Sequence, residues 1–250
     1  MFFVLDLTRT ITYDDIIMKL DFVSIFPEMF GAYFDESIMK RASEKRLIKV
    51  KAHDLRKWAS GKHHKVDDRP FGGGPGMVMM PDPFIKAIGA LARRQQLTTK
   101  FQGKFQQPKS NFLKPRVILM AASGKTFTHK DAVRLAKYKH LIFLCPRYEG
   151  VDARVEKFVD EKISIGDYVL TGGELPAMVV ADAVVRHLPG VLGKAESLAE
   201  ESHTIPGITE YPQYTRPEMY QKMKVPPVLL SGNHKKIEEW REKMMGSSND

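Results

Sequence analysis

Apolar and polar positions follow one another along the chain in blocks that predict alternating strands and helices. The segment Lys19–Phe26 alternates between apolar and polar residues, and Ile48–Ala52 does the same, so both are predicted to be strands. Between them, Pro27 begins a helix-like pattern that continues to Arg46. The regular part of the chain is therefore predicted to open with a β-α-β unit.

The middle of the chain continues this alternation. Two short apolar runs, Arg116–Ala121 and Leu141–Cys145, are predicted to be buried strands, and helices are predicted at Pro83–Arg94 and His129–Lys137. The intervening residues 95–114 are rich in Gln, Lys and Thr and are predicted to form a loop. Short buried strands that alternate with helices predict an α/β fold with a parallel sheet covered on both faces.

A third apolar region precedes a change of pattern. Ile163–Ile165 and Tyr168–Leu170 are short strand-like runs around Gly166 and Asp167, and Leu175–His187 is predicted to be an apolar helix. Residues 194–208 show no periodicity and have the mixed polar, Pro and Gly composition of an interdomain linker.

This pattern predicts two domains. We expect a large domain over residues 18–193 and a small helical domain over 209–250, with helices at Arg216–Lys222 and Lys235–Lys243. Residues 1–17 precede the regular pattern and are expected to be an N-terminal extension.

The charge of the chain favours an anionic partner. Lys and Arg outnumber Asp and Glu by 39 to 30 over 250 residues, and residues 40–69 carry 11 basic against 4 acidic side chains. Residues 93–116 carry 7 basic side chains and no acidic one. Both stretches are candidate phosphate contacts, and solvated surface is the alternative for each.

Cysteine content and hydropathy indicate the cellular compartment in which the protein is expected. A single cysteine, Cys145, excludes an intramolecular disulfide and a cysteine-based zinc site. The opening residues lack a signal-peptide pattern, and no apolar run has the length of a membrane span. We therefore expect a cytoplasmic protein with no membrane partner.

Three glycine-containing strings are candidates for ligand binding. They are DDRPFGGGPGMVMM at 67–80, CPRYEGVDAR at 145–154 and SIGDYVLTGGELP at 164–176. The first does not follow a strand, and Pro75 lacks the N–H that a phosphate-binding turn would use. A dinucleotide fingerprint and a P-loop are therefore excluded, which disfavours a nicotinamide-dependent oxidoreductase.

Four glycines, Gly150, Gly166, Gly172 and Gly173, come directly after predicted strands. Each alone is consistent with a plain turn, but ligands of open α/β sheets bind at these strand ends, so the group predicts one shared site. The histidines His53, His63 and His64 offer no convergent metal pattern, and RNA contact or plain surface is favoured for them.

Six strings in order together resemble the bacterial tRNA (guanine-37-N1)-methyltransferase family, TrmD, of the SPOUT superfamily. They are DDRPFGGGPG, RYEGVDAR, SIGDYVLTGGELPAM, PGVLG, YPQYTRP and VPPVLLSGNH. The resemblance implies a deep trefoil knot over about residues 116–193 and a bent S-adenosyl-L-methionine bound there. It places at the cofactor Met120, Pro146, Tyr148, Glu149, Gly150, Ser164, Ile165, Gly166, Asp167, Tyr168, Val169, Leu170, Gly172, Gly173 and Pro176.

Two positions depart from the family pattern near this cofactor. Pro146 stands where the family usually has glycine, and Met120 begins a Met-Ala-Ala-Ser-Gly string that replaces Leu-Ser-Pro-Gln-Gly. Pro146 has no N–H, so only a contact through its carbonyl is kept.

Methylation of guanine N1 requires removal of its proton and stabilisation of the negative charge that develops toward O6. The resemblance assigns Glu201 as the general base, one methylene longer than the family's aspartate, and Arg186 as the cation. Glu149 would face the methionine end of the cofactor or a magnesium ion. Without the resemblance, Glu201 would be interpreted as a solvated linker residue.

The resemblance also implies the substrate and the assembly. Asp67, Asp68, Arg69, Gly76, Asp182 and Arg186 are expected to hold a tRNA with guanine at position 37. Turn formation and a helix ion pair between Asp182 and Arg186 are the alternatives. The family is homodimeric, with Glu201 acting across the interface. A tRNA-binding homologue that has lost methyl transfer, and a SPOUT methyltransferase with another RNA target, are the rival functions.

Overall fold

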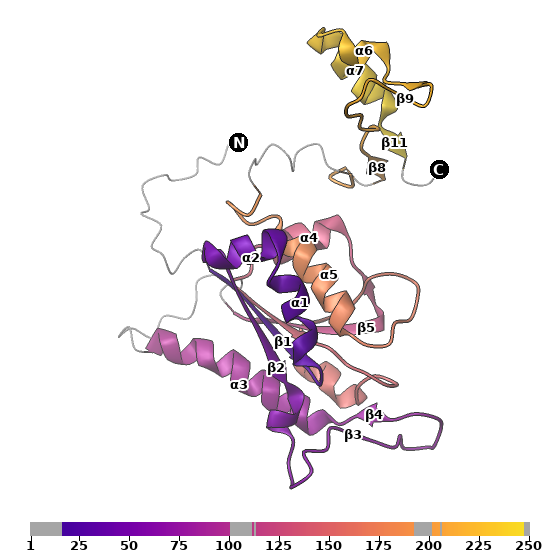
Figure 1. Ribbon diagram of the computed structural model, residues 1–250. Coiled ribbons are helices and arrows are strands. Elements are labelled where there is room, and N and C mark those ends of the chain that lie inside the picture. The colour runs from indigo at the N-terminus through magenta and orange to yellow at the C-terminus, as the bar shows by residue number, and fades with distance from the viewer. Residues whose placement is uncertain (1–16, 101–111, 113, 193–201, 206, 248–250) are drawn as a thin grey trace, which may run out of the picture. The chain divides into compact units, whose positions relative to one another are not determined.

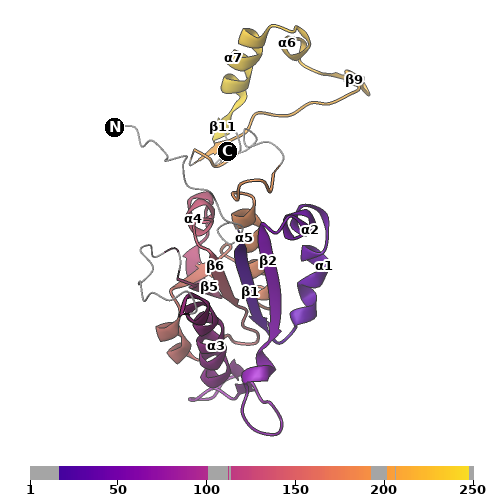
Figure 2. The same ribbon diagram turned by 90° about the vertical axis from the view of Figure 1, so that its left-hand side faces the viewer.

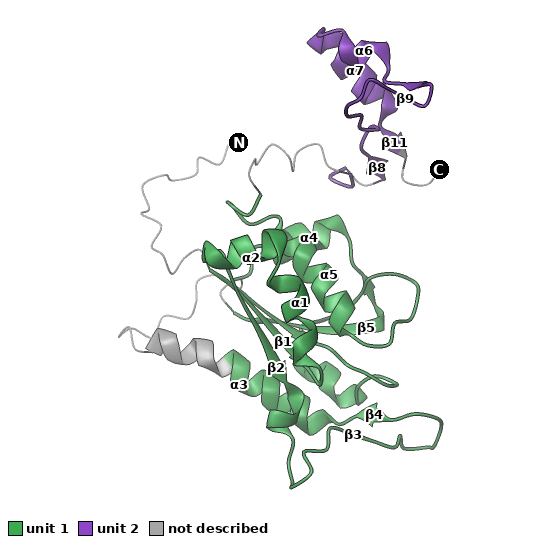
Figure 3. Cartoon of the chain, in the orientation of Figure 1, with its two compact units in different colours: residues 1–192 green, residues 193–250 purple. Residues whose placement is uncertain are grey.

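The computed structural model describes residues 17–100, 112, 114–192, 202–205 and 207–247. The chain divides into two compact units, residues 1–192 and 193–250 (Figure 3). In the described part of the chain, no helix is both long and apolar enough to cross a membrane.

Unit 1 is built on a central sheet with helices packed around it (Figure 1). The sheet has five strands in the order β2-β1-β6-β5-β7. All neighbouring strands run parallel, as the alternation of strands and helices predicts. The strands are β1 (Met18–Ser24), β2 (Ile48–Asp54), β5 (Arg116–Thr126), β6 (His140–Leu144) and β7 (Glu161–Ser164).

Helices cover both faces of this sheet. On one face, α1 (Gly31–Phe34), α2 (Ser37–Glu44), α4 (His129–Leu135) and α5 (Glu174–Val185) enclose a core in which Phe22 stacks on Phe143, with ring centroids 5.1 Å apart. The other face packs against α3 (Pro81–Lys100) and the 3-10 helices η3 (Leu55–Trp58) and η5 (Ala153–Phe158). Figure 2 shows α1 and α2 on the side of the sheet opposite α3. Successive strand residues alternate between the two cores, which is the period of a pleated strand.

Three predictions about unit 1 were wrong in detail. The predicted helix 27–46 is broken into η2 (Pro27–Met29), α1 and α2, because Ser37 has a φ of 49°, outside the helical region. The predicted loop 95–114 begins inside α3, which continues to Lys100. Residues 168–170 are not in a strand.

Strand β5 is longer than predicted because it contains a bulge. Met120 and Lys125 both pair with Ile163 of β7, so residues 121–124 leave the ladder. A Cβ at Gly124 would lie 2.7 Å from the backbone nitrogen of Ile163, so the bulge presses directly on β7. This close contact accounts for a glycine at the end of the bulge.

Unit 2 contains two strand pairs and two helices. They are β8 (Ile208–Thr209) with β11 (Gly246–Ser247), β9 (Met219–Tyr220) with β10 (Met223–Lys224), α6 (Pro227–Leu230) and α7 (His234–Met244). Helix α7 confirms the predicted helix 235–243. The predicted helix 216–222 was wrong, because Gln221 and Lys222 have φ values of 47° and 70° and form the two-residue turn of a hairpin.

Candidate functional site

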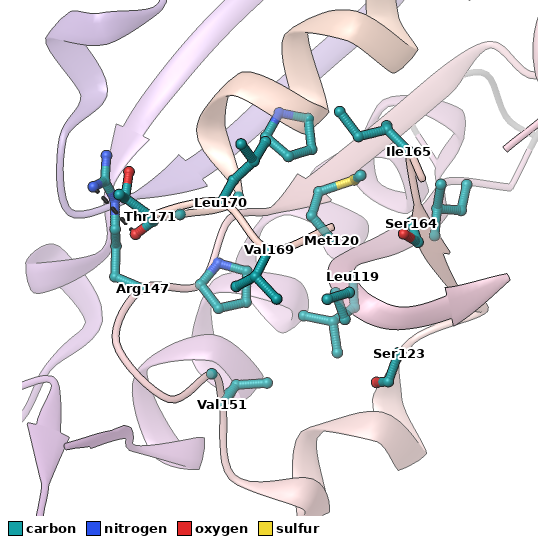
Figure 4. Close-up of a pocket in the computed structure, with 18 of the residues that line it drawn as sticks. Leu119, Met120, Ser123, Arg147, Val151, Ser164, Ile165, Val169, Leu170 and Thr171 are labelled. Atoms are coloured by element: carbon teal, nitrogen blue, oxygen red, sulfur yellow. Dashed lines mark hydrogen bonds between the residues drawn. The ribbon is translucent and has the colours of Figure 1, made fainter. Parts of the chain in front are cut away.

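A cavity of about 390 Å³ opens at the carboxyl ends of β5, β6 and β7. Most of its lining comes from three segments: residues 119–123 of β5, which include part of the bulge, the segment 146–151 after β6, and the segment 163–173 that includes the end of β7 (Figure 4). These three strands are neighbours in the sheet, and ligands of open α/β sheets bind at this edge.

The structure gathers almost all of the predicted cofactor residues around this cavity. Of the predicted cofactor residues, Gly166 and Asp167 do not line the cavity. The predicted residues that line it are Met120, Pro146, Tyr148, Glu149, Gly150, Ser164, Ile165, Tyr168, Val169, Leu170, Gly172, Gly173 and Pro176.

Sequence reasoning missed the remaining residues of the wall. They are Leu119, Ala121, Ala122, Ser123, Arg147, Val151, Glu156, Ile163 and Thr171. Arg147 and Thr171 lie inside strings already singled out, so continuity of those strings would have found them. Ala121, Ala122 and Ser123 belong to the Met-Ala-Ala-Ser-Gly string that departs from the family pattern, and the register break of β5 shows how they reach the wall.

The segment after β6 is held in a strained turn. Tyr148 has a φ of 59°, a left-handed conformation that costs a residue with a side chain roughly 1–2 kcal/mol. The N–H of Glu149 donates to the carbonyl of Met77 at 3.0 Å, and the N–H of Met79 donates to the carbonyl of Gly150 at 2.9 Å. The turn is therefore fixed along one side by residues 77–79.

The segment before α5 crosses close to the end of β6. The N–H of Gly173 donates to the carbonyl of Pro146 at 2.8 Å, and a Cβ at Gly173 would lie 2.8 Å from the Cα of Cys145. A Cβ at Gly172 would overlap the Arg147 side chain. Both glycines are thus required by packing, and the carbonyl of Pro146 keeps one lone pair for a ligand.

A buried ion pair joins these segments. Glu174 is fully buried, and its Oε2 accepts a hydrogen bond from Nε of Arg147 at 2.9 Å. Its Oε1 accepts a hydrogen bond from the hydroxyl of Ser24, the last residue of β1, at 2.5 Å. Because Glu174 is the first residue of α5, its carboxylate also lies at the favourable end of the helix dipole.

The predicted substrate residues divide into two groups. Asp67 and Asp68 form β3 (Asp67–Asp68), which pairs with β4 (Val78–Met79). The ammonium of Lys65, 3.0 Å from Asp68, lowers the pKa of that carboxyl, helped by the N–H of exposed Arg69. Gly76 has a φ of 77° and lies against Glu149, so this group is beside the cavity.

The second group lies at the other end of α5. Arg186 is the C-terminal cap of this helix, whereas Pro176 in its first turn lines the cavity. Twelve helical steps place Arg186 about 18 Å from Glu174 along the axis. Asp182 faces α1, because the Tyr33 hydroxyl of that helix donates a hydrogen bond to its carboxylate. Burial and the negative charge of Asp182 raise the pKa of Tyr33. The structure therefore does not bring Asp182 and Arg186 to the cavity of the same chain. Glu201 lies outside the described residues.

The interpretation of His53 as a surface or RNA-contacting residue was wrong. His53 is buried and its Nε2 lies 2.5 Å from Oδ1 of Asp21, while Nε2 of His140 lies 2.6 Å from Oδ2 of the same carboxylate. Among the described residues, no group of three or more His, Cys, Asp or Glu side chains is arranged to hold a metal ion.

Comparison with known proteins agrees with the resemblance found in the motifs. Residues 18–248 match the family model of tRNA (Guanine-1)-methyltransferase TrmD. A protein from Dictyoglomus turgidum (strain DSM 6724 / Z-1310), named tRNA (guanine-N(1)-)-methyltransferase, is 50% identical over 226 residues, which are 90% of this chain and 84% of the relative. The protein of the same name from Bacillus subtilis (strain 168) is 48% identical over 227 residues, 90% of this chain and 86% of the relative. The chain belongs to the tRNA (guanine-1)-methyltransferase TrmD family.

Proposed function

We propose that this chain transfers a methyl group from S-adenosyl-L-methionine to N1 of the guanine at position 37 of tRNA. The observation that carries the proposal is the match of residues 18–248 to one family of tRNA guanine methyltransferases. The cavity supports it, because two strings that carry the resemblance, RYEGVDAR and SIGDYVLTGGELPAM, come together there with the end of β5. We place this activity in the cytoplasm, as the lone thiol and the tRNA substrate suggest.

The cavity suits a compact cofactor held mainly by backbone and apolar groups. Its volume of about 390 Å³ lies within the range of small-molecule sites. Leu170 and Val169 provide apolar wall, and Ser164, whose hydroxyl bonds the Gly166 carbonyl at 2.8 Å, fixes the turn that carries them. When bound, the cofactor supplies an electrophilic methyl group on a sulfonium. The chain's own part is to hold that group still and keep it from water.

Proton removal from guanine N1 is assigned to Glu201, and stabilisation of the charge toward O6 to Arg186. Gly76 lies against Glu149 of the cavity wall, and Asp67 and Asp68 pair with the strand β4 that follows Gly76, so this group would hold the target base. Exposed Lys49 and Lys51 of the edge strand β2 belong to the basic stretch 40–69, which would contact phosphates of the anticodon stem. Unit 2 would contact the tRNA as well.

We further propose a homodimer in which Arg186 of one chain serves the cavity of the other. The distance of about 18 Å along α5 keeps Arg186 away from its own cavity. Exposed apolar side chains lie on α1 and α5, with Tyr33 41%, Leu175 52% and Val179 43% exposed, and Leu175 and Val179 share a helical face. Such a surface is suited to burial against a second copy.

A trefoil knot over residues 116–193 is part of the same proposal. Two close backbone approaches support it: Gly124 against Ile163, and Gly173 against Cys145. A chain that passes through its own loop needs such contacts, and folds of this kind are exceptions to the usual absence of threading.

The test is methyl transfer from labelled S-adenosyl-L-methionine to tRNA transcripts with guanine or adenine at position 37. We expect label only in the guanine transcript, and a rate about a hundredfold or more lower for Glu201→Gln. Binding of tRNA without transfer would favour the inactive homologue. Transfer that does not depend on Glu201 would support the methyltransferase activity but contradict the assignment of Glu201 as the general base.

The composite site is tested by mixing two variant chains, Arg186→Ala and Glu149→Ala. Each alone is expected to be inactive. Mixed dimers contain one intact site, so partial activity should return on mixing. If no activity returns, although light scattering shows that mixed dimers form, Arg186 does not serve the partner's cavity.

A further inference from the structure

Arg147 is the one cationic side chain among the described residues that line the cavity. Its guanidinium crosses from the segment after β6 to the segment before α5, where Nη1 donates to the carbonyl of Thr171 at 3.4 Å (Figure 4). A backbone bridge between Arg147 and Gly172 follows the same path. A positive charge is therefore built into the wall that joins the two segments.

This charge has a dedicated counter-ion behind the wall. Nε of Arg147 donates to Glu174 at 2.9 Å, and the Glu174 side chain is only 1% exposed. The hydroxyl of Ser24 donates to the other carboxylate oxygen, and the same hydroxyl accepts a hydrogen bond from the N–H of Phe26 at 2.8 Å. The ring of Phe26 lies 4.8 Å from the guanidinium carbon. Glu174 is thus fixed from both sides and has little freedom to leave Arg147.

The other two charged residues of the wall are acidic. Glu156 is paired with Lys162 at 2.9 Å, and Glu149 lies against Gly76. Glu174 is the carboxylate that pairs with the guanidinium of Arg147 and offsets its charge.

We propose that Glu174 neutralises Arg147 so that the cavity accepts a cationic methyl donor, and that Ser24 holds Glu174 in the position required for this. The inference rests on the proposed function, because the methyl donor carries a sulfonium charge and its demethylated product carries a neutral thioether. An unbalanced guanidinium in the wall would repel the donor and leave the product nearly unaffected. Glu174 is therefore a specificity-determining and positioning residue, which acts through Arg147.

Calorimetric titration of the full chain with S-adenosyl-L-methionine and with S-adenosyl-L-homocysteine distinguishes the effect of ligand charge on affinity from the effect of ligand shape. For Glu174→Gln, which keeps the size of the side chain, we expect the donor to lose about tenfold more affinity than the product. A unit charge at roughly 10 Å in a partly buried site has an effect of this size. In steady-state methyl transfer, the same variant should raise the KM for the donor and leave the KM for tRNA little altered.

Two further variants test the direction in which charge changes the ratio of donor affinity to product affinity. Arg147→Met removes the cation and is expected to shift the affinity ratio in favour of the donor, opposite to Glu174→Gln. The double variant should return the ratio to that of the unmodified chain, even if both affinities are lower. In Arg147→Met the Glu174 carboxylate keeps its hydrogen bond from Ser24 and its place at the N-terminus of α5, so this variant tests the proposal even where Glu174→Gln alone does not fold.

Asp21→Asn is the matched control, since it neutralises another largely buried carboxylate, which lies on β1 and away from the cavity lining. It should leave the ratio unchanged. Equal losses for donor and product in Glu174→Gln, or an Arg147→Met ratio that does not move, would overturn the proposal. Absence of binding of either compound to the unmodified chain would reject the proposed function itself, and this inference with it.

Discussion

Strand β1 takes part in two carboxylate clusters that differ in what they hold together. In the first, Asp21 accepts contacts from His53 of β2 and His140 of β6, so the cluster stays inside the sheet. In the second, Ser24 at the end of the strand bonds Glu174, whose partner Arg147 belongs to the cavity wall. Three positions along one strand separate a cluster that joins strands from one that joins loops.

The comparison teaches where a buried charge has a use beyond stability. A buried ion pair contributes little net stability over apolar packing, and breaking one side of it is costly. The Asp21 cluster fits a purely structural role, because its partners come from the strands on either side of β1. The Glu174 cluster sits between segments that no ladder joins, so there it also fixes the shape and charge of a binding site.

The largest expected effect is that of Glu174→Ala. This change leaves the largely buried Arg147 guanidinium without its carboxylate, and we expect the free energy of unfolding to fall by about 3–5 kcal/mol. Urea unfolding followed by circular dichroism measures it. A loss below about 1 kcal/mol would mean that solvent or another acid replaces Glu174.

Asp21→Asn should have a smaller effect on stability and none on the choice of cofactor. The amide offers one acceptor oxygen where the carboxylate offers two, so one of His53 and His140 loses its partner. A buried donor left unpaired costs about 1–3 kcal/mol. Urea unfolding at pH 7 measures the loss, and a changed KM for the methyl donor would contradict the separation of the two clusters.

Acid unfolding distinguishes the clusters further. Burial raises the pKa of Asp21, but the hydrogen bonds and charges of His140 and His53 outweigh it and hold that pKa well below its usual range. A carboxyl with a lowered folded pKa stabilises the protein above its unfolded pKa near 4, and loses that contribution as the pH falls toward the folded value. We therefore expect unmodified chain and Asp21→Asn to converge in stability below about pH 4. A gap that stays constant down to pH 2 would contradict this.

Ser24→Ala is expected to have the smallest effect. It removes one hydrogen bond from Glu174 and leaves the ion pair with Arg147 intact. The free energy of unfolding should fall by about 1–2 kcal/mol, as for a hydrogen bond to a charged group. Thermal unfolding measures it, with Ser231→Ala, whose exposed hydroxyl bonds only its own turn, as the control. If Ser24→Ala and Ser231→Ala lower the free energy of unfolding equally, Ser24 does not stabilise Glu174.

Most of the sheet was predictable because its strands are either continuous apolar runs, such as Leu141–Cys145, or segments in which apolar and polar residues alternate, such as Lys19–Phe26. The hairpin of β9 and β10 was not, because its turn uses Gln221 and Lys222 in left-handed conformations where Asn and Gly are the usual signal. Motif strings located the cavity residues. They did not pair Arg147 with Glu174, or Asp21 with two histidines, since such contacts depend on tertiary packing and carry no periodicity.

The bond between Ser24 and Glu174 also sets the order of events during synthesis, because the two residues lie 150 positions apart. At ribosomal rates of about 5–20 residues per second, Ser24 waits roughly 8–30 s before its partner is made. Arg147 is also made late, so β1 is made long before either member of the ion pair exists. The cofactor therefore cannot assist the early stages of folding, because its cavity needs residues up to Pro176.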